Sequence, residues 1–295
     1  MIPPIPKFQR IALIGKYKSP EIARPLLELA QFLEGRGVTV LLDELTAGHV
    51  GASRYPSMPL AQLGGEVELV IVLGGDGTML NIARILAPHK VAVVGVNQGR
   101  LGFLTDVSQE AMLETLGAML NGDYVAEERM LIEGEVRDGA GNCLFQALAF
   151  NDIAVNKGVG GSMVEFEVRI DGQFVYVQRS DGLVIATPTG STAYALSAGG
   201  PILHPSLDAI ALVPVCPHTL SARPIIVSNR ATVELIMHRS QGEARAHFDG
   251  HFHWDLREGD RLVIRRAEAT VRLLHPASHS YYHMLREKLH WSEAL

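Results

Sequence analysis

The alternation of hydrophobic and polar positions changes once along the chain. Up to about residue 105, continuous apolar runs at 8–15, 38–43, 68–75 and 91–97 are separated by segments whose apolar residues recur every three to four positions. The runs predict strands, and the recurring positions predict helices. Because strands this continuously apolar are usually covered on both faces, the pattern predicts an α/β domain with a Rossmann-like parallel sheet.

The helices of this first part follow ordinary signals. Ser19 and Pro20 supply an N-cap and a first-turn proline for one helix. Helical spacing also covers about 78–87 and 109–120. Residues 44–65 carry Gly, Pro and Ser without a strong period, which predicts a long loop.

The second pattern runs from about residue 124 to 275. Short β-rich runs, many of them alternating, are separated by turn signals such as 137–142. This predicts a mainly β domain. We expect the α/β domain to span 1–122 and the mainly β domain 123–279, with a helix-like segment at 280–295 that can pack back on the first domain.

Composition and charge exclude several classes of protein. With 295 residues, 47% of them hydrophobic and 20% charged, the chain is an ordinary globular protein long enough for two domains. The net charge of −6 argues against a nucleic-acid partner, and no apolar run reaches the ~18 residues of a membrane span. The N-terminus lacks an apolar signal core, so an unprocessed cytoplasmic protein is expected. Cys143 and Cys216 have no metal-ligand spacing and are predicted to be buried, reduced thiols.

The first candidate site is the segment 71-IVLGGDGTMLNIAR-84, where a buried strand meets a helix through a glycine turn. Such a turn at the carboxyl end of a parallel strand is where α/β sheets bind ligands. Gly74, Gly75 and Gly77 allow a phosphate to approach the backbone, and the amides that open the helix at Thr78 favour an anion. The segment is neither a Walker A loop nor a dinucleotide fingerprint.

Asp76 stands in the middle of this turn, and two interpretations of it remain open. Its side chain can cap the following helix. Alternatively, it can take a proton from an attacking hydroxyl or help to hold a metal ion, since a carboxylate among phosphates would otherwise be repelled.

The second candidate site is 181-DGLVIATPTGSTAYALSAGGPILHP-205, which places many hydroxyls around one turn and the start of a helix. Hydroxyls can satisfy phosphate or ribose oxygens without adding charge. Such turns are also common as purely structural ST-turns and caps. No nucleophile elbow is present, so serine hydrolysis is not indicated.

Polar residues elsewhere add weaker signals. Asn151 and Asp152 interrupt an apolar strand, which favours either a site or a turn. Arg179 and Asp181 precede the hydroxyl-rich strand and can equally form an ion-paired strand edge. The histidines of 247-HFDGHFHWD-255 lack a metal motif, so they are predicted to be solvated or packing residues, and no metal ligands are predicted within the chain.

Taken together, LGGDGTML (73–80), FND (150–152) and the long run at 181–205 resemble the NAD kinases of the bacterial type, in the family's order and over roughly residues 10 to 275. The glycine motif alone is shared with diacylglycerol and sphingosine kinases, whereas TPTGSTAYALSAGGP is specific. The resemblance implies an α/β domain and a mainly β domain with the site in the interdomain cleft. It also implies that ATP phosphorylates the 2′-hydroxyl of the adenosine ribose of NAD, giving NADP and ADP.

The resemblance carries roles onto particular residues. Asp76 is implied to accept the proton of that hydroxyl. The phosphate-binding positions expected from the glycine turn itself are Gly74, Gly75 and Thr78. Substrate-binding positions are implied at Gly77, Asn151, Asp152, Ser162, Arg179, Asp181, Thr192, Ala193, Tyr194, Ala195, Leu196, Ser197 and His251. Lys157 is an alternative to Ser162 for the contact made by its loop.

The implied partners are NAD and ATP, with Mg²⁺ arriving with ATP and with two or four copies of the chain assembling. A lipid kinase of the diacylglycerol type and a non-catalytic NAD-binding module are the two other hypotheses. A thin-layer assay with diacylglycerol tests the first, and calorimetry showing NAD binding without turnover tests the second.

Overall fold

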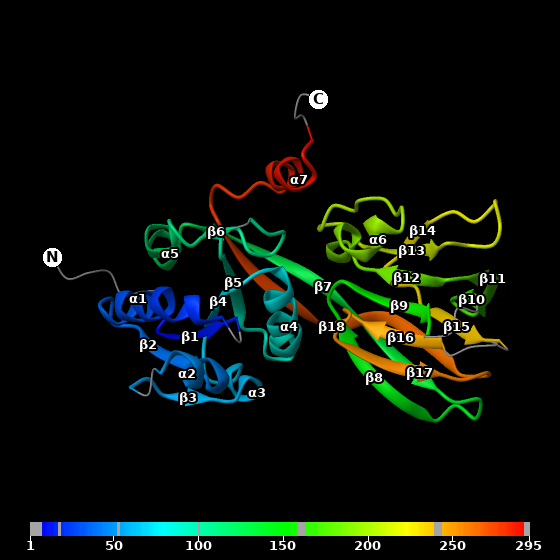
Figure 1. The fold of residues 1–295 in the computed structure, drawn as a ribbon, viewed down its shortest axis with the longest axis horizontal. Coiled ribbons are helices and arrows are strands. Elements are labelled where there is room, and N and C mark those ends of the chain that lie inside the picture. The colour runs from blue at the N-terminus through cyan, green and yellow to red at the C-terminus, as the bar shows by residue number, and fades with distance from the viewer. Residues whose placement is uncertain are drawn as a thin grey trace. The chain divides into compact units, whose positions relative to one another are not determined.

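A computed structural model describes residues 8–16, 19–51, 54–99, 101–158, 163–238 and 244–291. The chain divides into two compact units, one comprising Met1–Glu128 with Thr270–Leu295 and the other comprising Arg129–Ala269. Strands β7 (Tyr124–Arg137) and β18 (Arg261–Pro276) both continue from one unit into the other (Figure 1). The predicted domain limits lie at 122/123 and 279, and the C-terminal segment belongs to the first unit.

The first unit is built on a parallel sheet with the strand order β3-β2-β1-β4-β5. Short strand β6 and the last part of β18 also pair with β5 in parallel. Consecutive residues of β1 and of β4 are buried, so both faces of these strands are covered, as the continuous apolar runs predict. The strands are β1 (Arg10–Gly15), β2 (Thr39–Asp43), β3 (Ser57–Met58), β4 (Leu69–Leu73), β5 (Ala92–Asn97) and β6 (Val107–Ser108).

Helices follow the strands of this unit. Helix α1 packs Leu26, Leu29 and Leu33 in one core with Leu13 and Ile71 of the sheet. Helix α4 directly follows β4 and contacts β4 and β5. The longer helices are α1 (Ala23–Glu34), which follows a 3-10 turn at Pro20–Ile22, α4 (Asp76–Leu86), which is followed by a 3-10 turn at Ala87–His89, α5 (Met112–Leu120) and α7 (Tyr281–Leu289). Among the described residues, no helix is both long and apolar enough to cross a membrane.

The sequence predictions for residues 44–65 and for the two cysteines are wrong. Residues 44–65 are not a loop, because they contain α2 (Glu44–Val50), β3 and α3 (Leu60–Leu63). The capping signal was overlooked: the Asp43 carboxylate accepts the Thr46 N–H at 3.1 Å, and Gly51 ends α2 at φ 63°. Cys143 and Cys216 are both exposed rather than buried, since each stands at the end of a strand beside a turn.

The second unit is mainly β, as predicted. One sheet has the order β14-β13-β12-β9-β16-β17, and β11-β10-β15-β18 and β7-β8 form antiparallel pairs in the other. Side chains of both sheets, such as Ile153, Phe248, Phe166 and Leu235, share one core. The strands are β8 (Cys143–Ala149), β9 (Asp152–Lys157), β10 (Val164–Ile170), β11 (Gln173–Ser180), β12 (Gly182–Ala186), β13 (Ala209–Val215), β14 (Ile225–Ser228), β15 (Val233–Met237), β16 (Ala244–Phe248) and β17 (Phe252–Leu256).

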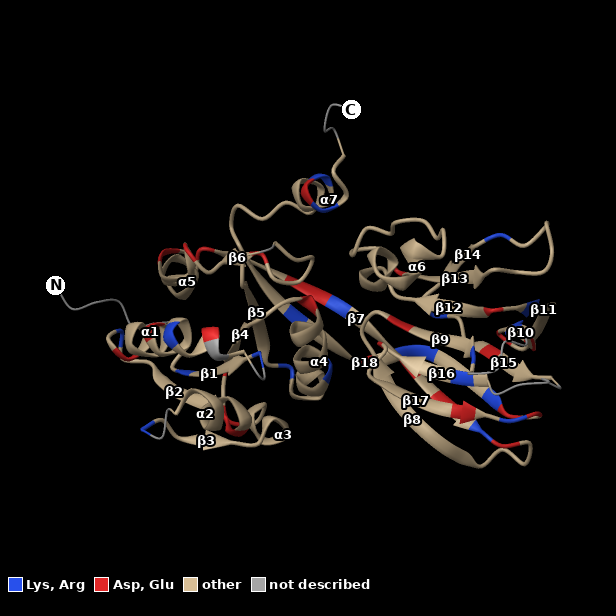
Figure 2. Ribbon diagram, viewed as in Figure 1, with Lys and Arg blue, Asp and Glu red and all other residues tan. Residues whose placement is uncertain are grey.

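Charged residues of both signs lie interspersed on the strands of this unit (Figure 2). Many of them are paired across neighbouring strands, for example Arg245 with Asp255 at 2.7 Å and Arg265 with Glu133 at 3.1 Å. The surface of these strands is therefore mixed in charge and carries several cross-strand ion pairs.

Candidate active site

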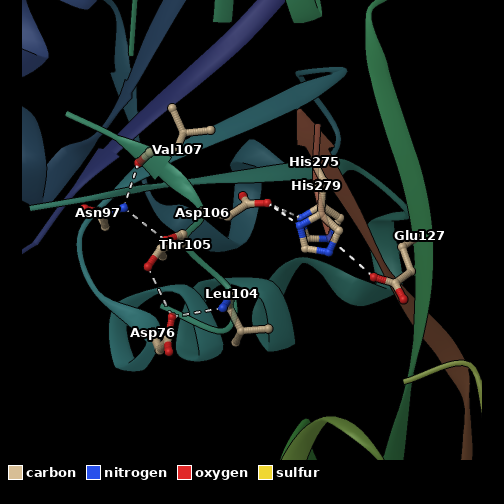
Figure 3. A network of polar contacts seen from close by, with 9 residues as sticks. All are labelled: Asp76, Asn97, Leu104, Thr105, Asp106, Val107, Glu127, His275 and His279. Carbon is tan, nitrogen blue, oxygen red and sulfur yellow. Dashed lines mark hydrogen bonds and ion pairs between the residues drawn. The ribbon is translucent and has the colours of Figure 1, made fainter. Parts of the chain in front are cut away.

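Asp76 is the first residue of α4, at the point where buried strand β4 ends. Its carboxylate accepts the Phe103 N–H on Oδ2 at 2.8 Å. Its Oδ1 accepts the Leu104 N–H at 3.0 Å and the Thr105 hydroxyl at 3.1 Å (Figure 3). Gly75 occupies the N-cap position, and among the described residues no side chain caps this helix. The capping interpretation of Asp76 is therefore wrong, because its carboxylate is held by a different loop.

That loop reaches Asp76 because β5 lies beside β4 in parallel, so both strands end at the same edge of the sheet. At the end of β5, the Asn97 side-chain amide donates to the carbonyl oxygens of Thr105 and Val107 at 3.2 and 3.1 Å (Figure 3). The Gly102 N–H donates to the Thr105 carbonyl at 3.0 Å. These bonds fold the loop back over the glycine turn, and no sequence argument above had singled it out.

The predicted phosphate-binding residues lie on either side of Asp76 in the sequence. The Gly74 N–H donates to the Val96 carbonyl at 2.9 Å, and a Cβ at Gly74 would lie 3.0 Å from the Thr78 Cβ. Gly75 and Gly77 are exposed, with nothing within 4 Å of the position a Cβ would take. Backbone at Gly75 and Gly77 is thus open to a ligand, whereas Gly74 is needed for close packing.

The second unit holds a depression of about 320 Å³. Four of the predicted residues line it, and five others were missed by sequence reasoning. The predicted residues are Asn151, Asp152, Ala193 and Tyr194, and the others are Ala154, Asn156, His247, Asp249 and Gly250.

Asp249 is the most informative of the missed residues. Its carboxylate accepts the backbone N–H groups of Phe150 at 2.9 and 3.0 Å, of Asn151 at 2.7 Å and of Asp152 at 3.2 Å. One carboxylate therefore fixes the whole Phe-Asn-Asp turn. Asp249 lies about a hundred residues from Phe150, so no local pattern in the sequence links the two.

Asp152 is buried beside this carboxylate. Burial, and to a lesser extent the charge of Asp249, raises the pKa of Asp152 from about 3.8 to about 7. The same environment raises the pKa of the Tyr194 hydroxyl, mainly through burial and then through the charge of Asp152. Near neutral pH, Asp152 is therefore poised to donate as well as to accept a hydrogen bond.

The raised pKa of Asp152 predicts a pH-dependent stability. Its folded pKa of about 7 lies above the ordinary value of 3.8, so its contribution to stability is complete below pH 3.8 and is lost as the pH rises to about 7. Asp152→Asn is expected to match the parent near pH 4 and to be more stable by roughly 2–4 kcal/mol at pH 8. Urea unfolding at both pH values measures this. Asp123→Asn, at an exposed site, is the control, and an equal difference at both pH values would contradict the prediction.

The hydroxyl-rich turn is largely structural. Thr187 Oγ1 donates to the Phe150 carbonyl at 2.7 Å, and Ser191 Oγ donates to the Pro188 carbonyl at 2.6 Å and accepts the Leu203 N–H at 2.9 Å. The side chains of Thr187 and Ser191 are fully buried. These hydroxyls tie the region of the 3-10 turn Thr189–Thr192 to Phe150 and Leu203, which is the structural alternative stated from the sequence.

The other predicted positions are scattered in this unit. Ala195 is buried in an apolar cluster, whereas Leu196 and Ser197 lie on helix α6 (Tyr194–Ser197) with partly open or exposed side chains. Thr192 Oγ1 donates to the Thr189 carbonyl at 3.2 Å. His251 lies in the exposed turn between β16 and β17, where its Nδ1 is 2.9 Å from the Asp249 carbonyl oxygen.

Arg179 and Asp181 are ion-paired in this unit, as one sequence interpretation allowed. Arg179 lies 3.6 Å from Glu165, and Asp181 lies 2.8 Å from Lys157. Lys157, the alternative to Ser162 for the loop contact, is therefore engaged with a predicted substrate-binding residue. Ser162 itself lies outside the described residues.

Comparisons with known proteins show which family the chain resembles. The model of the ATP-NAD kinase N-terminal domain matches residues 11–124, and that of the C-terminal domain matches residues 150–275. The chain is 60% identical to the NAD kinase of Nitrosospira multiformis over 97% of this chain and 96% of that protein. It is 56% identical to the NAD kinase of Nitrosomonas europaea over 98% and 97% of the two chains.

Two solved structures share the fold. An Archaeoglobus fulgidus NAD kinase in complex with ATP is 26% identical, covers 94% of this chain and 99% of its own, and has a TM-score of 0.73. The yeast NADH kinase complexed with NADH has a TM-score of 0.89 over 98% of this chain and 89% of its own, at 22% identity, which speaks for the fold alone.

A parallel α/β unit with a glycine turn and a firmly held carboxylate, joined to a mainly β unit, defines a phosphotransferase of the nucleotide-kinase class. The chain belongs to the NAD kinase family, since both of the family's domain models match and relatives at more than half identity cover nearly its whole length. The predicted family, fold class and enzyme class are thereby confirmed.

Proposed function

We propose that the chain transfers the γ-phosphoryl group of ATP to the 2′-hydroxyl of the adenosine ribose of NAD, giving NADP and ADP. The single observation that carries the proposal is the Asp76 carboxylate, fixed by three hydrogen bonds at the end of a buried parallel strand. A carboxylate has about four lone-pair directions, so one remains for a substrate hydroxyl.

Asp76 acts by orientation and by late proton transfer. Phosphoryl transfer passes through a loose transition state in which positioning and charge neutralisation matter more than covalent participation of the protein. The bonds from Phe103, Leu104 and Thr105 fix the carboxylate, so that it aligns the attacking hydroxyl and receives its proton as the new bond to phosphorus forms. The exposed backbone at Gly75 and Gly77 is suited to the phosphates, with Gly77 also against NAD.

Residues of the second unit bind NAD in this proposal. Asn151, Asp152 and Tyr194 line one depression, and an Asn amide with a carboxyl group of raised pKa offers both donors and acceptors to a ribose or an amide. The backbone of 192–197, with Arg179, Asp181, Ser162 and His251, supplies further contacts that are inherited from the family resemblance.

We also propose a metal ion that accompanies ATP, a cellular location and an oligomeric state. Mg²⁺ enters with ATP as part of the substrate, where it neutralises phosphate charge. The chain works in the cytoplasm as a dimer or tetramer. Sedimentation of the purified chain tests the assembly.

The proposal is tested with purified chain, ATP, Mg²⁺ and NAD. NADP is expected to form and is measured with an NADP-specific dehydrogenase, while ADP is measured in parallel. ADP without NADP, or NAD binding by calorimetry without turnover, would contradict it and favour the binding-module hypothesis. Crossing NAD and NADH with ATP and polyphosphate then defines donor and acceptor.

A further inference from the structure

A buried polar cluster lies in the first unit, and none of its members has a role in the proposed function. Asp106 comes from the loop after β5, His275 from the end of β18, and His279 from the turn before α7. The side chains of His275, Asp106 and His279 are 2%, 9% and 12% exposed, so solvent screens them little. A cluster of three ionisable groups at this depth requires an explanation.

The donor atoms of the cluster converge on one point. Nδ1 of His275 lies 2.9 Å and Nδ1 of His279 lies 2.7 Å from the same oxygen, Oδ2 of Asp106 (Figure 3). All three ligand atoms lie within 4.8 Å of one another. Metal bonds of about 2.1 Å would place tetrahedral donors roughly 3.4 Å apart, so an ion requires the two Nδ1–Oδ2 distances to lengthen by about 0.5–0.7 Å.

A turn of the chain brings the two imidazoles together beside Asp106. The His279 N–H donates to the Pro276 carbonyl at 2.9 Å, which turns the chain back on itself. As a result, the rings of His275 and His279 stack with centroids 4.0 Å apart at 23°, and the same nitrogen of each faces Asp106. The His-x₃-His spacing falls in the range found in zinc sites.

A second carboxylate lies behind His275. Nε2 of His275 is 3.3 Å from Oε2 of Glu127, so both ring nitrogens face carboxylate oxygens (Figure 3). With a metal ion on Nδ1, Nε2 would face the Glu127 carboxylate, as in the carboxylate–histidine–metal arrangement that orients metal ligands in proteins. A dication also balances the two carboxylates.

We propose that Asp106, His275 and His279 bind one divalent transition-metal ion of the Zn²⁺ type, with Glu127 orienting His275. Two imidazoles and one carboxylate suit Zn²⁺ and its neighbours, whereas Mg²⁺ prefers an all-oxygen shell. This site is separate from the Mg²⁺ that accompanies ATP. Its nearest link to the proposed chemistry is Thr105, the neighbour of Asp106, whose hydroxyl donates to Asp76.

The test measures metal binding without substrates, so its result does not depend on the proposed function. The full chain is freed of metal with a chelator and titrated with Zn²⁺ against a chromophoric competitor. One tight equivalent per chain is expected. His279→Gln and Asp106→Asn should each weaken it at least about 100-fold, and Glu127→Gln, which alters only the orienting carboxylate, about 10- to 100-fold with one equivalent retained. His283→Gln, at an exposed position on α7, is the matched control and should change nothing.

Co²⁺ supplies a second readout. Visible absorption of four-coordinate Co²⁺ is expected in the parent chain and should be lost in His279→Gln, while circular dichroism confirms that both chains are folded. Absence of a tight equivalent in the parent would overturn the proposal. So would an equivalent that survives His279→Gln and Asp106→Asn but is lost in His247→Gln, because His247 and His253 face each other across β16 and β17 with ring centroids 5.7 Å apart.

Discussion

Asp76→Asn is expected to lower kcat by about 10²-fold or more while leaving the affinity for NAD nearly unchanged. The amide has the shape of the carboxylate but cannot take a proton from the attacking hydroxyl. It is also a poorer fit to the loop, because Oδ1 and Oδ2 both accept N–H groups, from Leu104 and Phe103, and an amide has only one oxygen. Steady-state kinetics measure the loss of kcat, and calorimetry measures the affinity for NAD.

Two controls sharpen this experiment. Asp123→Asn makes the same chemical change at an exposed position of the same unit and should leave kcat unchanged. Thr105→Val removes one hydrogen bond to Asp76 but keeps the carboxylate, so it should cost only about 3- to 10-fold in kcat. If Asp76→Asn kept the parent kcat, the assignment of Asp76 as proton acceptor would be wrong.

The fold was largely predictable because its determinants are local. Continuous apolar runs such as 69–73 and 92–97 require burial on both faces, which only a covered parallel sheet supplies. The error over 44–65 also has a local cause, since an Asp43–Thr46 cap and a left-handed Gly51 delimit a helix of seven residues that has no clear apolar period. Exposure of Cys143 and Cys216 was misjudged because their neighbours in the chain are apolar while their positions are strand ends.

The site was predictable only in part, because its hydrogen bonds cross long distances in the chain. Asp76 could be singled out by its glycines, but the groups that hold it come 27 to 29 residues later. Asn151 could be singled out as a polar interruption, but Asp249, 98 residues away, fixes its backbone. Spacing along the chain carries no trace of such pairs. For the same reason, the hydroxyls of 187–192 were ambiguous: whether Ser191 meets a ligand or Leu203 is decided by packing.

Gly102→Ala is expected to lower kcat by about 10²-fold through Asp76, although residue 102 has no chemistry of its own. A Cβ at this position would lie 2.0 Å from Asp76 Oδ1 and 2.3 Å from Thr105 Oγ1, far inside van der Waals contact. Both obstacles are side chains, so the protein can fold by displacing the carboxylate or the loop, at about 1–3 kcal/mol of stability. Either displacement misplaces the proton acceptor. Kinetics and urea unfolding of the variant measure both effects.

The decisive measurement for Gly102 is a double-mutant cycle with Asp76→Asn. If the methyl group acts by displacing Asp76, Gly102→Ala should cost little further kcat once the carboxylate has been removed, so the two losses will not add. Gly48→Ala is the control: nothing lies within 4 Å of that position inside α2, and the change should keep kcat and raise stability by about 0.5–1 kcal/mol. Additive losses in the cycle would mean that Gly102 acts independently of Asp76, and the loop of 102–105 would then have a role other than holding the acceptor.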